Sequence, residues 1–259
     1  MPYVEFDDAL THYRWDGAET RPTLVLANSL GTALAMWDPQ IAAWSERFHV
    51  LRYDMRGHGA STVLPGPYTV EQLAGDALAL LDKLRIERAH FCGLSLGGMV
   101  AMWLAVHVPQ RIDRLILCNT AAMIPPPEVW DARIEAVNQG GMQAVTQAVL
   151  ERWFTPAFRD RDPAAVDRVR AMLLGTDPRG YVAACAAVRD NDQREAVRGI
   201  AAPTLVIAGT HDPSTPPAQA RFLVDRIPGA RYVELPAAHL SNIEAPAPFD
   251  AAVLDFLTA

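Results

Sequence analysis

The sequence predicts an α/β fold, a mostly parallel and doubly wound sheet with an inserted helical segment. Short apolar runs alternate with amphipathic helical patterns through most of the 259 residues. One of these runs leads through a glycine-rich turn directly into an apolar helix. The alternation stops at residues 122–198, which carry three consecutive prolines near their start and then read as helices alone. We therefore expect a core of residues 1–121 and 199–259, and a helical cap at residues 122–198.

The elements before the glycine-rich turn follow from apolar periodicity. Thr23–Ala27 and His49–Tyr53 are apolar runs of strand length. Residues 35–48 place large apolar side chains at helical spacing, which predicts a helix between these strands. Thr69–Gln72 has the form of a capping box, in which a threonine and a glutamine satisfy the first backbone N–H groups of a helix.

The second half of the alternation surrounds the helical insertion. Ala89–Cys92 reads as a buried strand, and the helix that follows it covers Met99–Val108. Leu115–Asn119 reads as the last strand before the insertion. Thr204–Ala208 and Arg231–Leu235 read as strands after it, so the pattern of a doubly wound sheet resumes.

The turn between the buried strand and its helix contains the pattern G-x-S-x-G. A serine at this place sits on a strained turn and projects above the sheet, next to backbone N–H groups of the helix. Gly93 and Gly97 suit the turn because larger side chains would collide with the backbone. A glycine-rich turn without chemistry is the alternative, but the strand and helix around it favour Ser95 as a nucleophile.

A nucleophilic serine needs a base and an acid, which follow it in this fold in the order acid, then histidine. Asp212 and His239 each lie just past the end of an expected strand, at the edge of the sheet where ligands bind. His239 would accept the serine proton, and Asp212 would hold the imidazole in the right tautomer. The strand before the insertion ends in Asn119 rather than an aspartate, which favours Asp212 as the acid.

Composition and charge exclude several other functions. The formal net charge of −7 argues against a nucleic-acid-binding protein. No apolar stretch reaches the length of about 18 residues that a membrane span needs. The three cysteines show no metal-ligand spacing, and with no signal peptide they indicate a cytoplasmic protein. Neither a dinucleotide fingerprint nor a phosphate-binding loop is present, so we expect no metal and no cofactor.

At the level of motifs, the whole chain resembles the α/β-hydrolases. The motif D-x-R-G-H-G-x-S at Asp54–Ser61, the turn around Ser95 and the late His239 are shared by many activities of that superfamily. The segment Asn28–Gly31 is typical of fewer activities, because most relatives have His-Gly where this chain has Asn-Ser. In this the chain is most similar to the 3-oxoadipate enol-lactonases of bacterial aromatic-acid degradation, the β-ketoadipate pathway.

This resemblance implies a reaction and an oxyanion hole. The implied substrate is a small anionic enol-lactone, whose ring Ser95 would open to give 3-oxoadipate without a cofactor. The backbone N–H groups of Leu30 and Leu96 would stabilise the negative oxygen of the intermediate. For Arg56 and His58 of the shared motif, a structural role is favoured over a catalytic one.

An anionic substrate in an acidic protein calls for a local cation, which the helical insertion can supply. Trp130, Arg133 and Trp153 are the expected contacts of the substrate, and Arg133 follows Trp130 at a spacing that places both on one helix face. Arg152 and Arg189 are alternatives for the carboxylate. Each of these residues also has an ordinary interpretation, as a solvated arginine or a core aromatic.

Several rival functions use the same scaffold. An esterase, a perhydrolase or a carbon–carbon bond hydrolase would keep the same serine, acid and histidine. A haloalkane dehalogenase or an epoxide hydrolase would carry aspartate at the position of Ser95. A ligand receptor on this fold would have lost one of the three catalytic residues, whereas this chain retains them all.

Overall fold

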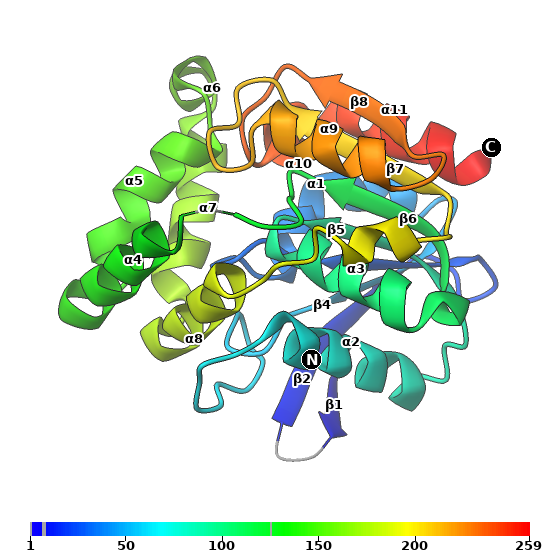
Figure 1. Ribbon diagram of the computed structural model, residues 1–259, viewed down its shortest axis with the longest axis horizontal. Coiled ribbons are helices and arrows are strands. Elements are labelled where there is room, and N and C mark those ends of the chain that lie inside the picture. Colours follow the sequence, from blue (N-terminus) through cyan, green and yellow to red (C-terminus); the bar gives the residue numbers. More distant parts are fainter. Residues whose placement is uncertain (1, 7–8, 125) are drawn as a thin grey trace.

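A single sheet organises the molecule (Figure 1). The computed structural model describes residues 2–6, 9–124 and 126–259. Its eight strands lie in the order β1-β2-β4-β3-β5-β6-β7-β8. The pairs β1–β2 and β2–β4 are antiparallel, and all later pairs are parallel. The strands are β1 Tyr3–Phe6, β2 Ala9–Asp16, β3 Thr23–Ala27, β4 His49–Tyr53, β5 Ala89–Leu94, β6 Ile112–Cys118, β7 Thr204–Gly209 and β8 Arg231–Leu235. The predicted fold class is confirmed.

Helices cover both faces of this sheet. Helices α1 and α11 pack against each other on one face, while α2, α3 and α9 lie on the other (Figure 1). The short helix α10 joins β8 to α11. These helices are α1 Asp38–Trp44, α2 Val70–Lys83, α3 Leu96–His107, α9 Pro217–Arg226, α10 Ser241–Glu244 and α11 Pro246–Thr258. Because the central strands are covered from both sides, every residue of β5 and β7 is buried.

The segment between β6 and β7 contributes helices that gather beside one end of the sheet (Figure 1). Helix α4 packs on α5 and α8, and α5 packs on α7. The helices are α4 Pro127–Gly140, α5 Gln143–Trp153, α6 Pro156–Arg161, α7 Pro163–Gly175 and α8 Pro178–Arg189. Of the three prolines at the entry, Pro125 lies outside the described residues. The division into a core and a cap stays a prediction.

Local expectations are met with two differences. The capping box at Thr69 and Gln72 is confirmed, with hydrogen bonds of 3.0 and 3.1 Å. The helix expected over residues 35–48 is instead a 3₁₀ turn followed by α1, which ends at Trp44. The hairpin of β1 and β2 was not predicted. Within the described residues, no helix has the length and apolar character needed to cross a bilayer.

Candidate active site

Ser95 occupies the tight turn between β5 and α3. Its φ of 58° lies in the left-handed region, which is strained for a residue with a side chain. A Cβ on Gly93 would lie 2.1 Å from the carbonyl oxygen of Gly97, and one on Gly97 would lie 2.3 Å from that of Ala27. The predicted reason for both glycines is therefore confirmed: the backbone leaves no room for a side chain. This crowding holds Ser95 above the carboxyl edge of the sheet.

His239 and Asp212 meet at the same edge of the sheet, after β8 and β7. The imidazole Nδ1 of His239 lies 2.8 Å from Oδ2 of Asp212, and both side chains are buried. With Nδ1–H donating to the carboxylate, the lone pair of the neutral ring is on Nε2. The indole of Trp153 lies against the imidazole, with ring centroids 6.1 Å apart. The ring is thus held on two sides.

The carboxylate of Asp212 accepts further hydrogen bonds that fix its position. Oδ1 accepts from the backbone N–H groups of Ser214 and Thr215, at 2.7 and 3.0 Å. Oδ2 accepts from the Thr215 hydroxyl at 2.7 Å and from the Asn119 amide at 3.0 Å. Burial disfavours the charged carboxylate, but the neighbouring His239 and the bonds from Thr215 outweigh it, so the pKa of Asp212 lies below its usual value. Asp212 is therefore ionised at neutral pH.

The backbone N–H groups of Leu30 and Leu96 have the positions expected of oxyanion-hole donors. Leu30 follows β3, and Leu96 is the first residue of α3, where helical N–H groups lack partners within the helix. In the described part of the chain, neither N–H donates a hydrogen bond to another protein group. The loop after β3 is tied to the turn by the Gly97 N–H, which donates to the Asn28 carbonyl at 2.9 Å.

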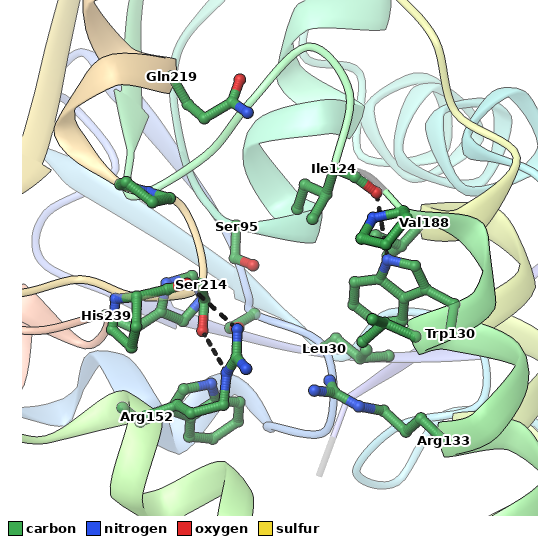
Figure 2. A pocket seen from close by; sticks show the side chains of 16 residues that line it. Leu30, Ser95, Ile124, Trp130, Arg133, Arg152, Val188, Ser214, Gln219 and His239 are labelled. Atoms are coloured by element: carbon green, nitrogen blue, oxygen red, sulfur yellow. Dashed lines mark hydrogen bonds between the residues drawn. The ribbon is translucent and has the colours of Figure 1, made fainter.

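A cavity of about 300 Å³ brings most of the predicted residues together (Figure 2). Six of the predicted site residues line it, namely Leu30, Ser95, Trp130, Arg133, Trp153 and His239. Asp212 and Leu96 stand behind this lining, Asp212 as the partner of His239 and Leu96 as the neighbour of Ser95. The cavity lies between the carboxyl edge of the sheet and helices α4 and α5, so both parts of the fold contribute to its wall.

Of the two alternatives to Arg133 as the partner of the carboxylate, only one lines this cavity. Arg152 lines the cavity, whereas Arg189 does not. Arg189 instead forms ion pairs of 2.7 Å with Asp131 and with Asp190. Arg133 lies over the ring of Trp130, with its guanidinium carbon 4.7 Å from the ring centroid, as their spacing predicted. The pattern of residues did not separate Arg152 from Arg189, because both stand near the ends of helices.

One important contact was missed from the sequence, a link between the inserted helices and the histidine loop. Buried Glu244 accepts from the Ala238 N–H at 2.9 Å and from the hydroxyl and N–H of Thr155. The Leu240 N–H donates to the Trp153 carbonyl at 3.2 Å. The two residues next to His239 in the chain are thus both fixed. Leu240 is bound to Trp153 at the end of α5, and Ala238 is bound to Glu244, whose carboxylate also binds Thr155.

The shared motif after β4 has structural partners. Arg56 forms a bidentate pair with Asp76 of α2, at 2.7 and 2.5 Å. His58 is buried, and its Nδ1 lies 3.1 Å from the Arg56 carbonyl oxygen. Neither side chain lines the cavity. Across residues 2–6, 9–124 and 126–259, no group of three histidine, cysteine or acidic side chains is placed to hold a metal ion.

Known proteins resemble this chain along its length. A family described as the alpha/beta hydrolase fold matches residues 22–246. The 3-oxoadipate enol-lactonase 2 of Acinetobacter baylyi is 41% identical over 259 residues, which cover 98% of this chain and 97% of that protein. The 3-oxoadipate enol-lactonase 1 of the same organism is 39% identical over 90% of this chain and 88% of its own.

Solved structures agree with these relatives. The enol-lactonase from Burkholderia xenovorans has a TM-score of 0.98 and 50% identity, with all of both chains covered. A thermophilic esterase from Thermogutta terrifontis, solved with malate bound, has a TM-score of 0.91 and 28% identity, over 96% of this chain and 93% of its own. The chain therefore belongs to the α/β-hydrolase fold family, and it is a hydrolase.

Proposed function

We propose that this hydrolase opens the ring of 3-oxoadipate enol-lactone to give 3-oxoadipate, a step of the β-ketoadipate pathway. In this proposal Ser95, Asp212 and His239 are the catalytic residues, and residues 122–198 form a cap over them. The observation that carries the proposal is that Ser95, His239 and the cation of Arg133 line one cavity of about 300 Å³. The similarity to two enol-lactonases of Acinetobacter baylyi supports the choice of lactone.

Acylation begins when the Ser95 hydroxyl attacks the ring carbonyl carbon and His239 accepts the hydroxyl proton. The carbonyl oxygen becomes negative, and the backbone N–H groups of Leu30 and Leu96 stabilise it. The ring C–O bond then breaks, and the imidazolium returns its proton to the leaving enol oxygen. The enol relaxes to a ketone, which makes the ring opening hard to reverse.

Deacylation repeats these steps with water as the nucleophile. His239 takes a proton from water, and the resulting hydroxide attacks the ester carbon of the acyl-enzyme. The same two N–H groups stabilise the second oxyanion. The C–O bond to Ser95 breaks, and the serine regains its proton from the imidazolium. The new carboxylic acid gives its proton to solvent, so a second carboxylate is released. Throughout, ionised Asp212 stabilises the imidazolium that forms transiently.

The substrate's own carboxylate needs a partner in the cavity, and Arg133 suits this role. It is a cation of α4 that lies over Trp130 and forms no ion pair with a carboxylate in the described part of the chain. A guanidinium can hold a carboxylate through two parallel hydrogen bonds. The binding of this group would orient the lactone carbonyl toward Ser95.

The test is hydrolysis of 3-oxoadipate enol-lactone beside a neutral aryl acetate and a ring-cleavage dienoate, in the natural protein and in Arg133→Ala. The natural protein should prefer the enol-lactone. Arg133→Ala should lose about tenfold or more in kcat/KM for the enol-lactone, the scale of a lost charged hydrogen bond, and should change little on the aryl acetate. Arg189→Ala is the matched control, because its cation lies outside the cavity.

Two outcomes would refute this proposal. A preference for the aryl acetate, or for a ring-cleavage dienoate, would assign the cavity to an esterase or a carbon–carbon bond hydrolase. Equal losses of Arg133→Ala on charged and neutral substrates would make Arg133 a structural residue rather than the carboxylate partner.

A further inference from the structure

The cavity contains a second cation that the proposed reaction has not used. Arg152, near the end of α5, lines the same cavity as Arg133 of α4. Figure 2 shows the two guanidinium groups facing the same space, with Arg152 on the side of His239 and Arg133 on the side of Trp130. Among the ion pairs of the described residues, none joins either guanidinium to a carboxylate. Two cations therefore face one cavity, and neither forms an ion pair with a carboxylate of the described residues.

The hydrogen-bond acceptors that hold Arg152 in place are neutral. Its Nη2 donates to the Pro213 carbonyl at 3.1 Å, and its Nε donates to the Ser214 hydroxyl at 3.3 Å. Burial and then the positive charge of Arg133 lower the pKa of Arg152 below its usual value, against the attraction of Asp212. The protein therefore keeps two like charges close together in a partly enclosed space, where a bound anion would relieve their repulsion.

The proposed reaction changes the charge of the molecule in this cavity. The lactone carries one carboxylate, and ring opening releases a second one at the carbon that Ser95 attacked. Arg152 lies on the same side of the cavity as the proposed base His239, while Arg133 lies toward Trp130 (Figure 2). A short dicarboxylate can therefore place one carboxylate on each guanidinium, whereas the lactone has only one to place.

We propose that Arg133 and Arg152 form a two-cation site for short dicarboxylates, in which Arg152 takes the carboxylate released by ring opening. This proposal rests on the proposed function for the order of events. The dianionic product binds more tightly than a monoanion of the same length. Short dicarboxylates consequently act as competitive inhibitors, and the enzyme slows as its product accumulates.

The experiment compares inhibition by adipate with inhibition by monomethyl adipate, a monoanion of the same chain length. Hydrolysis of a neutral aryl acetate is the reporter, and calorimetric titration of adipate repeats the comparison without turnover. In the natural protein, the inhibition constant of adipate should be lower than that of its monoester by about tenfold or more. This is the scale of an added charged hydrogen bond. Arg152→Gln should remove most of this difference, because it should weaken the binding of adipate and leave the binding of the monoester nearly unchanged.

Two further variants control this experiment. Arg189→Gln should behave as the natural protein, because its cation lies outside the cavity. Arg152→Lys keeps the charge and loses the planar fork, so its preference for adipate should be intermediate. Circular dichroism of each variant excludes general damage to the fold.

Two results would overturn the two-cation site: equal inhibition by adipate and its monoester in the natural protein, or an unchanged adipate constant in folded Arg152→Gln. Neither result depends on the lactone being a substrate. If the preference for adipate is found but 3-oxoadipate enol-lactone is not hydrolysed, the dicarboxylate site stands and the proposed function fails.

Discussion

At the scale of single residues, the decisive feature is how fully the carboxylate of Asp212 is hydrogen bonded. Two backbone N–H groups, the Thr215 hydroxyl, the Asn119 amide and the imidazole of His239 all approach it within 3.0 Å. A buried carboxylate needs such donors, because removing it from water disfavours its charge. The same donors leave the carboxylate little freedom, so it can orient the imidazole.

Thr215→Val tests this arrangement with a nearly isosteric change. It removes the hydroxyl that donates to Oδ2 at 2.7 Å and keeps the backbone N–H that donates to Oδ1. We expect kcat to fall about tenfold, the scale of a hydrogen bond to a charged group, with KM little changed. Thr204→Val is the matched control, because among the described residues the hydroxyl of this buried threonine of β7 bonds to the nearby Ala202 carbonyl and to no group of the site. Equal effects of the two substitutions on kcat would contradict the role of Thr215.

At the scale of elements, the inserted helices and the loop after β8 form one unit around His239. Glu244 of α10 accepts from Thr155, which starts α6, and from the N–H of Ala238. Trp153 at the end of α5 accepts from Leu240 and stacks on the imidazole. The helices that line the cavity thus also hold the proposed base. A change at the α5–α6 junction should therefore affect the chemical step as well as substrate binding.

Glu244→Gln should reveal this coupling. The amide replaces one acceptor oxygen with a donor, so it cannot serve both Ala238 and Thr155 as the carboxylate does. We expect a loss of about 1–3 kcal/mol in the free energy of unfolding, together with a lower kcat. Glu234→Gln provides the control, because the exposed ion pair of Glu234 with Arg221 contributes at most about 1 kcal/mol to the free energy of unfolding. A stability loss with kcat unchanged would show that the junction does not position His239.

At the scale of the whole molecule, the sheet explains why residues far apart in the chain meet. Leu30, Ser95, Asn119, Asp212 and His239 each follow a parallel strand, and all five strands end at one edge. Residues of the inserted helices line the cavity at that edge. The buried groups that hold this frame also make its stability depend on pH.

His58 provides a measurable part of that dependence. Burial lowers its pKa, although the Arg56 carbonyl and Asp54 oppose this, so the unfolded chain binds a proton at a higher pH than the folded one. The contribution of His58 is therefore complete above its unfolded pKa, about 6.5, and is lost as the pH falls toward its folded pKa. The free energy of unfolding from urea titrations should fall less steeply below pH 6.5 in His58→Gln than in the natural protein.

The comparison of slopes isolates His58, because the other buried groups are the same in both proteins. These include His90, whose pKa burial also lowers, and Asp250, whose pKa burial raises to about 6 and whose effect has the opposite sign. Parallel curves for the two proteins would contradict the expected role of burial.

The sequence predicted the fold and the order of the proposed catalytic residues, because both depend on local patterns. Apolar runs of strand length marked the central sheet, and a polar residue after such a run must lie at its carboxyl edge. The hairpin of β1 and β2 was missed because both strands mix polar and apolar residues, and β1 is a short strand at the edge of the sheet. Glu244 and Thr155 were missed because their contact joins residues that are distant in the chain and lie in segments without a strong motif.

The proposed reaction passes through an acyl-enzyme on Ser95. The most direct measurement is intact-mass analysis, with peptide mapping, of protein mixed with 3-oxoadipate enol-lactone and quenched with acid within one turnover. We expect a transient mass increase equal to the mass of the lactone, located on Ser95 and absent in Ser95→Ala. This variant should also lose several orders of magnitude in kcat. An adduct on another residue, or turnover by Ser95→Ala above about a tenth of the natural rate, would contradict it.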